Sequence, residues 1–301
     1  MPAAVTGEHP IGDIDASRID EDLVRSLIAE QFPAWVDLPV RGVPYGGNDH
    51  RMFRLGDALS VRLPSAPGYV PQVAKEQRWL PHLSRSLPLP IPTLHGIGRP
   101  SRAFPGPWSI YGWIEGDPAA VVEIDDTREF AADLAAFLVA LRAVDAADGP
   151  AAGLHSGYRG GPLAHYHDET VAIVDRVSGR ERDLAEGIWR DALAAAFDGP
   201  PVWVHGDMSI NNLLVREGRL GAVVDFGCSA VGDPACDTVI VWTFFDGPAA
   251  AVFRRDLTVD DGTWARGRGW ALWKALLMID SPHPAHVSEA RRVLDRLFEG
   301  A

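Results

Sequence analysis

Two neighbouring stretches decide how this chain folds: VHGDMSINNLLV at residues 204–215 and AVVDFG at residues 222–227. Apolar runs flank each polar centre, which predicts strand, loop and strand with polar side chains at the strand ends. Asp207 and Asn212 lie five residues apart on one loop, and Asp225 follows 18 residues after Asp207. Phosphoryl transfer requires such a set: a carboxylate for the incoming hydroxyl, and an amide and a second carboxylate for Mg²⁺.

Each motif taken alone has a simpler interpretation. An isolated His-Gly-Asp is usually a turn, and an isolated Asp-Phe-Gly is often a strand end followed by a glycine turn. A His-Asp pair can also bind a metal, but no further His or Cys stands at ligand spacing here. The spacing and the flanking strands together favour a functional set.

The motifs HGDxxxxN (205–212), VDFG (224–227) and GDPACD (232–237) resemble those of the aminoglycoside phosphotransferase family. That family also includes macrolide phosphotransferases and relatives such as choline and homoserine kinases. The resemblance runs from about residue 20 to 298. It implies an α+β, bilobal fold similar to eukaryotic protein kinases, with a small antiparallel-sheet N-lobe at 1–113 and a larger, mostly helical C-lobe at 114–301.

The same resemblance assigns roles to single residues. It implies that Asp207 is the catalytic aspartate and that Asn212 and Asp225 bind Mg²⁺ and, through it, the nucleotide. Asp237 resembles the aspartate that braces the catalytic loop in the family, and we interpret Asp233 as structural too. His205 is expected to orient the loop rather than to act as a base.

The order of predicted elements agrees with such a fold. The first third is rich in strands and the remainder in helices. Strands are predicted at 38–43, 51–55 and 59–63, and the resemblance gives 108–116 as a strand that leads into a hinge and an acidic-Gly turn. Helices are predicted at 20–31, 70–83, 127–144, 168–177, 181–197, 238–245, 253–257, 263–279 and 287–298.

Several residues of the first third are candidates for nucleotide binding. Gly46 and Gly47 lie where a kinase-like fold places its phosphate-covering loop, although two glycines also suit an ordinary hairpin turn. Arg62 stands where protein kinases carry a phosphate-binding Lys, and it keeps the charge with a different reach and shape. Lys75 competes for that role. Glu76, on the following predicted helix, is expected to pair with Arg62, or else to be solvated.

Aromatic residues offer two further interpretations. The resemblance places backbone groups near Tyr111 and Trp113 at the adenine edge of the nucleotide; the alternative is that these rings belong only to the core. Trp242, Trp264, Trp270 and Trp273 gather in predicted helices. We interpret them as core packing, with a substrate-binding wall as the alternative.

Composition limits the classes of partner. The chain has 301 residues, of which 47% are hydrophobic and 23% are charged, and this composition is typical of a globular protein. Its net charge of −13 argues against nucleic acid as the main partner. The acidic balance is compatible with solubility alone or with a cationic acceptor. No apolar run is long enough for a membrane span, no secretory signal is evident, and two cysteines fit a reducing cytoplasm.

The sequence therefore predicts an O-phosphotransferase that uses ATP or GTP with Mg²⁺ and acts on a small hydroxylated molecule. An aminoglycoside-like antibiotic is the first candidate acceptor, with antibiotic resistance as the implied role; a macrolide or a small metabolite such as an amino alcohol or sugar is the alternative. A nucleotide-binding pseudokinase would lack one of the three polar residues. A protein kinase is disfavoured because Gly206 replaces Arg and only five residues separate Gly227 from Asp233. The oligomeric state is left open.

Overall fold

The computed structural model describes residues 14–43 and 49–299, and these form two compact units. The first unit comprises the described residues up to Ser84 together with Ile91–Ile114. The second comprises Arg85–Pro90 and the described residues from Glu115 onward. Within the described part of the chain, no helix combines the length and the apolar character that a membrane crossing needs.

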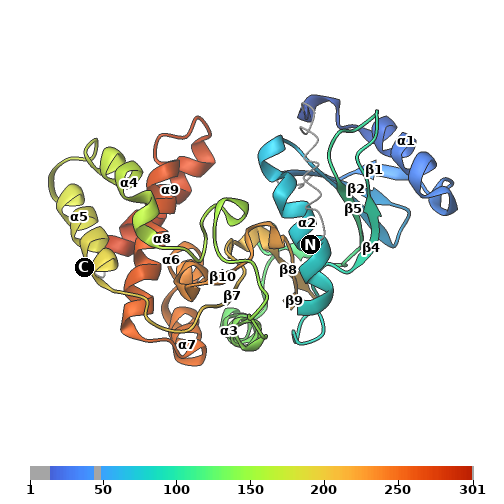
Figure 1. Cartoon of the computed structure of the whole chain (residues 1–301). Coiled ribbons are helices and arrows are strands. Elements are labelled where there is room, and N and C mark those ends of the chain that lie inside the picture. The colour runs from blue at the N-terminus through green and yellow to red at the C-terminus, as the bar shows by residue number, and fades with distance from the viewer. Residues whose placement is uncertain (1–13, 44–48, 300–301) are drawn as a thin grey trace, which may run out of the picture. The chain divides into compact units, whose positions relative to one another are not determined.

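The first unit is built on an antiparallel sheet (Figure 1). Its strands follow the order β1-β2-β3-β5-β4, with bounds β1 Val40–Gly42, β2 His50–Leu55, β3 Leu59–Pro64, β4 Leu94–Gly98 and β5 Trp108–Gly112. Gly56 turns β2 into β3 with a φ of +60°, a conformation that glycine adopts without a steric cost. The three predicted strands are thus present, and the strand expected within 108–116 is β5, which ends at Gly112.

Two helices accompany this sheet. Helix α1 (Glu21–Gln31) begins after Asp20, whose side chain accepts a hydrogen bond from the Leu23 N–H at 2.9 Å. It buries Val24, Leu27 and Ile28 in the same core as the sheet residues. Helix α2 (Val70–Leu83) has the predicted bounds. Strand β4, which follows the prolines at 88–92, was not among the predicted elements.

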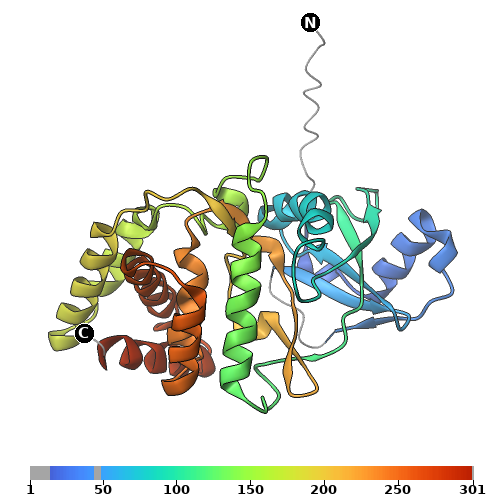
Figure 2. The same ribbon diagram turned by 90° about the horizontal axis from the view of Figure 1, so that it is seen from below.

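The second unit is mostly helical, as predicted. Its helices are α3 Thr127–Ala143, α4 His167–Val174, α5 Gly179–Ala194, α6 Ile240–Thr243, α7 Gly247–Leu257, α8 Asp261–Met278 and α9 Pro284–Glu299. Helix α3 lies beside α7, as Figure 2 shows in green and orange. Helix α8 packs on α5 and α9 and has tight contacts to the short helix η8 (Pro234–Val239). The predicted helix at 238–245 is therefore wrong in part: its first residues continue the 3₁₀ turn of η8.

Short strands of the second unit frame the polar loops. Strands β6 Asp117–Pro118, β8 Leu213–Arg216 and β9 Arg219–Val223 form one sheet, and β7 Val202–Val204 pairs with β10 Ala230–Gly232. The strand–loop–strand pattern predicted at 204–227 is confirmed. The α+β class, with an antiparallel sheet first and helices afterwards, is confirmed as well.

Candidate functional site

The loop of residues 205–212 begins directly after β7 and carries Asp207 at its centre. Gly206 adopts a φ of +83°, and a Cβ at this position would overlap the carbonyl oxygen of Cys228. Only glycine fits both the left-handed backbone and the close approach. The sequence difference from protein kinases, Gly206 in place of Arg, therefore has a local steric cause.

Asn212 holds Asp207 in a fixed orientation. Its side-chain Nδ2 donates to the Asp207 backbone carbonyl at 2.9 Å and to Asp207 Oδ2 at 3.1 Å. Because both N–H groups of the amide point toward Asp207, the Oδ1 atom of Asn212 is available to a cation. The backbone carbonyl of Asn212 accepts from the Val224 N–H at 2.9 Å, which ties the 205–212 loop to the strand end that precedes Asp225.

Asp225 lies at that strand end in an unusual backbone conformation. Its φ is +62°, and its carboxylate accepts a hydrogen bond from the Gly227 N–H at 3.3 Å. Such conformations carry a strain of about 1–3 kcal/mol and occur often at functional sites. The charge of Asp225 acts on Asp207, whose pKa it raises. The structure thus brings the three predicted residues of the two loops together.

The charge state of Asp207 results from opposing effects. Burial is the largest single effect and raises the pKa of its carboxyl group, but the charge and the hydrogen bond of Lys274, together with a smaller effect of His205, leave the net pKa below the ordinary value. Asp207 is therefore ionised near neutral pH. An ionised carboxylate is the form that accepts a hydroxyl hydrogen bond.

The 205–212 loop is braced from below by a buried carboxylate. Asp237 is fully buried on η8; its Oδ2 accepts from the His205 N–H and its Oδ1 from the Gly206 N–H, each at 2.8 Å. Burial raises the pKa of Asp237, while the two N–H donors and Arg142 favour its charged form. The predicted bracing contact of Asp237 is confirmed.

His205 is also fully buried, between backbone groups. Its Nδ1 accepts from the Asp207 N–H at 3.3 Å, and its Nε2 lies 3.0 Å from the Val224 carbonyl oxygen, to which it must donate. Both ring nitrogens are therefore engaged in holding the loop. This agrees with the expectation that His205 orients the loop.

Asp233 has a structural environment as well. Its carboxylate caps η8 through the Ala235 N–H at 3.1 Å and pairs with the Arg266 guanidinium at 2.7 and 3.1 Å. Both side chains of this ion pair are buried. Helix α8, which carries Arg266, is thereby attached to η8, which carries Asp237.

In the first unit, the predicted ion pair between Arg62 and Glu76 is confirmed. The Arg62 Nη1 atom on β3 lies 2.7 Å from Glu76 Oε1 on α2, and the Glu76 side chain is almost completely buried. The Tyr111 hydroxyl donates to the other Glu76 oxygen at 3.4 Å. Burial and the neighbouring Glu76 raise the pKa of Tyr111. Lys75 is buried on the same helix.

The proposed adenine contact stays a prediction. Tyr111 pairs with Ser60 on one side and Leu94 on the other, and the Trp113 N–H donates to the Ala58 carbonyl at 2.8 Å. Much of this backbone is therefore engaged in the sheet. Gly46 and Gly47 lie outside the described residues.

The donor set fits Mg²⁺ bound together with a nucleotide. Among residues 14–43 and 49–299, no group of three or more His, Cys, Asp and Glu could hold a metal ion. Mg²⁺ in nucleotide sites needs only one or two protein oxygens, because phosphates and water complete its shell. Asn212 Oδ1 and the Asp225 carboxylate supply such oxygens.

The sequence analysis named the tryptophans but missed the two cations and the tyrosine that lie near them and near the 205–212 loop: Lys274, Arg159 and Tyr166. The Lys274 ammonium on α8 lies 2.9 Å from Asp207 Oδ1. The Arg159 guanidinium lies 4.4 Å from the ring centroid of Trp273, which stacks on Tyr166 at 4.2 Å. Trp270 joins this group edge-on, whereas Trp242 packs with Trp264 separately. The four tryptophans thus form two clusters. The scarcity of lysine in the chain is the one signal that could have pointed to Lys274.

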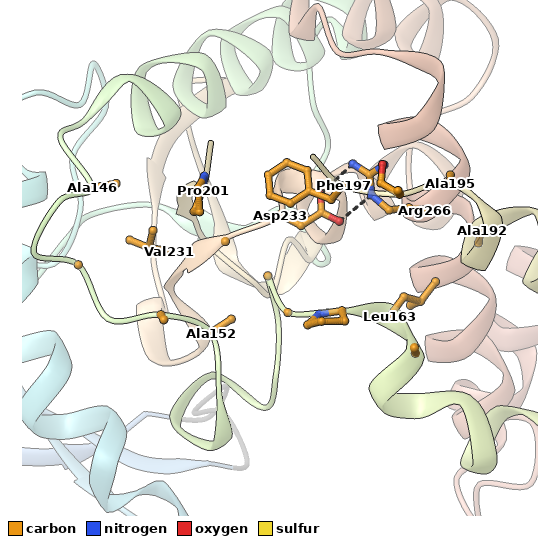
Figure 3. Close-up of a pocket in the computed structure, with 18 of the residues that line it drawn as sticks. Ala146, Ala152, Leu163, Ala192, Ala195, Phe197, Pro201, Val231, Asp233 and Arg266 are labelled. Atoms are coloured by element: carbon orange, nitrogen blue, oxygen red, sulfur yellow. Dashed lines mark hydrogen bonds and ion pairs between the residues drawn. The ribbon is translucent and has the colours of Figure 1, made fainter. Parts of the chain in front are cut away.

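A cavity of about 840 Å³ lies elsewhere in the second unit (Figure 3). Alanine, glycine and proline residues make up much of its wall, and Asp233 and Arg266 are also among its lining residues. Neither Asp207, Asn212 nor Asp225 is among its described lining residues. We therefore do not place the transfer site in this cavity.

Comparisons with known proteins link the chain to one enzyme family. A sequence profile described as the phosphotransferase enzyme family matches residues 40–270. An aminoglycoside 3'-phosphotransferase of Escherichia coli is 35% identical over 75 residues, which cover 24% of this chain and 27% of that protein. The match thus spans about a quarter of the relative's length.

Solved structures match over almost the whole chain. The GDP complex of an aminoglycoside 2'-phosphotransferase-IIIa has a TM-score of 0.74 at 19% identity, covering 93% of this chain and 99% of that one. A macrolide 2'-phosphotransferase from Brachybacterium faecium has a TM-score of 0.64 at 22% identity, covering 92% and 98%. At these identities the likeness shows the fold, and the predicted bilobal, kinase-like fold is confirmed.

Proposed function

The chain belongs to the phosphotransferase enzyme family, and from this we propose that it transfers the γ-phosphoryl group of ATP or GTP to a hydroxyl group of a small molecule. The observation that carries the proposal is the joining of Asp207, Asn212 and Asp225 through two adjacent loops. These supply one carboxylate for the acceptor and two oxygens for a metal–nucleotide complex.

Asp207 is assigned to the acceptor. Its ionised carboxylate accepts a hydrogen bond from the hydroxyl group and takes the proton as the oxygen–phosphorus bond forms. The bond between the γ-phosphorus and the bridging oxygen breaks at the same time, and the nucleoside diphosphate leaves with the electron pair. Asn212 and Asp237 keep the carboxylate and its loop in place, so that the main contribution is positioning.

Asn212 Oδ1 and Asp225 are assigned to Mg²⁺. When bound, the ion would neutralise charge on the β- and γ-phosphoryl oxygens. In the first unit, Arg62, oriented by Glu76, is our candidate for a further phosphate contact, with Lys75 as the alternative. The reaction needs cytoplasmic pools of nucleotide and Mg²⁺, and we place it there.

For the acceptor we propose an aminoglycoside-like molecule first. The net charge of −13 favours the approach of a cationic compound. Relatives and neighbours of this chain include aminoglycoside phosphotransferases, one of them solved with ATP and streptomycin. If the acceptor is an antibiotic, resistance is the expected consequence.

A macrolide is the second candidate acceptor. Trp270 and Trp273 are almost completely buried, which favours core packing over a substrate-binding wall for these two rings. A solved neighbour is a macrolide phosphotransferase. Amino alcohols and sugars are further alternatives. The nucleotide is equally open, because neighbours were solved with GDP and with ADP.

A panel of aminoglycosides, macrolides, amino alcohols and sugars, each with ATP and with GTP, tests the proposal. Product is detected as the mass gain of one phosphoryl group together with release of nucleoside diphosphate. We expect Asp207→Ala to lower turnover by about 100-fold or more while nucleotide affinity changes little. Nucleotide binding without transfer to any hydroxyl compound would instead identify a binding protein.

A further inference from the structure

The catalytic carboxylate proposed above has a cationic partner that comes from a distant helix. Lys274 Nζ lies 2.9 Å from Asp207 Oδ1, although 67 residues separate them in sequence. Both side chains are only partly exposed, at 29% and 35%. Since Asn212 donates to the other oxygen, Asp207 is held from both sides. Oδ1 retains a second lone pair, which an acceptor hydroxyl can use.

Helix α8 is fixed against the 205–212 loop, so this contact does not depend on a flexible backbone. Arg266 attaches α8 to η8 through Asp233, and Gly267 lies so close to Thr238 that a Cβ would overlap its hydroxyl. Next to Lys274, the Trp273 Nε1–H donates to Glu169 Oε2 at 2.8 Å. Only the lysine side chain itself is therefore free to adjust.

The use of lysine in this chain is selective. Of the 28 lysine and arginine residues, two are lysines, Lys75 and Lys274. Arginine supplies exposed helix pairs such as Arg25–Glu21 and Arg182–Glu186. A guanidinium at position 274 would favour a planar, two-pronged contact with Asp207. An ammonium binds one oxygen and keeps two further N–H donors, which rotate freely toward another acceptor.

The position of those donors follows from the chemistry of the site. An acceptor hydroxyl that donates to Asp207 Oδ1 would lie next to Lys274 Nζ, which donates to the same oxygen. The phosphoryl group that is transferred to this hydroxyl would then lie close to the Lys274 ammonium. In the proposed function, Asn212 and Asp225 would hold the metal ion that supplies further charge neutralisation to the phosphates. Negative charge on the phosphoryl oxygens thus develops within reach of an ammonium that is already in place.

We propose that Lys274 is a catalytic residue: its ammonium donates to Asp207 Oδ1 before the reaction and to an oxygen of the γ-phosphoryl group during transfer. This rests on the proposed function. The acceptor oxygen bonds to phosphorus, the bond to the bridging oxygen breaks, and the hydroxyl proton goes to Asp207. Lys274 keeps its proton throughout and stabilises charge. Two competing roles are acceptor binding and a purely structural ion pair.

Steady-state kinetics of Lys274→Met and Lys274→Arg separate these roles. Loss of a preorganised donor to the transferred group is expected to lower kcat by about 100- to 1,000-fold, with KM for nucleotide and acceptor nearly unchanged. Lys274→Arg should recover part of the rate, since it keeps the charge. The matched control is Arg268→Met. Arg268 is a cation on the same helix, but its guanidinium donates to the Leu297 carbonyl and not to Asp207. The kcat of this variant should stay near that of wild type.

Other outcomes overturn the inference. A kcat of Lys274→Met within threefold of wild type excludes a catalytic role, and a change confined to the acceptor KM makes Lys274 an acceptor-binding residue. An equal loss in Arg268→Met makes the effect structural. Wild-type protein without activity on any acceptor would count against the proposed function instead.

A labelling experiment gives a readout that does not depend on turnover. An acyl phosphate of ADP places a carbonyl carbon where the γ-phosphorus would lie; an amine there attacks it, forms an amide and releases ADP. With two lysines in the chain, peptide mass spectrometry identifies the labelled one. We expect acylation of Lys274 that excess ATP or GTP prevents. Absence of a nucleotide-protected label on Lys274 contradicts the inference.

Discussion

Replacing Asp237 by Asn measures how strongly the buried brace holds the 205–212 loop. Each carboxylate oxygen accepts one backbone N–H at 2.8 Å, from His205 and from Gly206, and the side chain is fully buried. Asn retains one acceptor oxygen, but its NH₂ group must face the other N–H. One hydrogen bond to a charged group is lost, and one buried donor is left without a partner.

The magnitude follows from these two changes. A hydrogen bond to a charged group contributes about 1.5–3 kcal/mol, and an orphaned buried donor costs about 1–3 kcal/mol. The two values describe overlapping effects and are not added in full. In addition, the neutral Asn side chain avoids the cost of burying a charge, the same cost that raises the pKa of Asp237. We therefore expect Asp237→Asn to lower the free energy of unfolding by about 2–4 kcal/mol, and Asp237→Ala, which orphans both donors, by more.

Urea unfolding followed by tryptophan fluorescence measures these differences, with kcat measured on the same samples. Thr238→Val is the matched control: it removes a neighbouring buried hydrogen bond, from the Thr238 hydroxyl to the Ala235 carbonyl, but no contact with the loop. It should cost about 1 kcal/mol and leave kcat nearly unchanged. The reasoning is refuted when Asp237→Asn unfolds like wild type, or when it loses no more activity than Thr238→Val.

Further substitutions test single contacts of the two units. Gly206→Ala forces a Cβ onto the Cys228 carbonyl at a φ of +83°; we expect a loss of about 2 kcal/mol or more and a larger loss of kcat, and wild-type-like activity would contradict the steric account. Arg62→Ala removes the ion pair of Arg62 with the buried Glu76; nucleotide KM should rise, and an unchanged KM makes Lys75 the next residue to replace. Asp225→Ala should weaken Mg²⁺-nucleotide affinity, which Mg²⁺ titrations with the bound nucleotide would reveal, and an unchanged Mg²⁺ dependence would refute the metal assignment.

Local sequence patterns were sufficient for the parts of the site that lie close together in the chain. Asp207 and Asn212 are five residues apart, so a tight loop alone brings their side chains into contact. The helix predicted at 20–31 likewise begins where expected, since the Asp20 side chain caps α1 through a contact only three residues away in the chain. The pair Arg62–Glu76 was also predicted, although it joins two elements, because strand and helix followed each other in the expected order.

Contacts that depend on helix packing were beyond the sequence. Lys274 reaches Asp207 only because α8 packs on η8, and no periodicity in residues 261–278 indicates which face meets the 205–212 loop. Nearly every face of α8 is covered, so its burial shows no single apolar stripe. For the same reason, the division of the tryptophans into two clusters could not be predicted. The strand β4 was missed because its Gly-rich sequence lacks the alternation of a strand.

The two attachments of the 205–212 loop share one origin. Asp237 binds its backbone from η8, and Lys274 binds its central carboxylate from α8. The Asp233–Arg266 pair and the close contact of Gly267 with Thr238 join these two helices. The position of Asp207 relative to the Lys274 ammonium is therefore set by packing within the second unit alone. Because catalysis by positioning requires such fixed distances, the long-range contacts that local patterns miss are also those on which the proposed transfer depends.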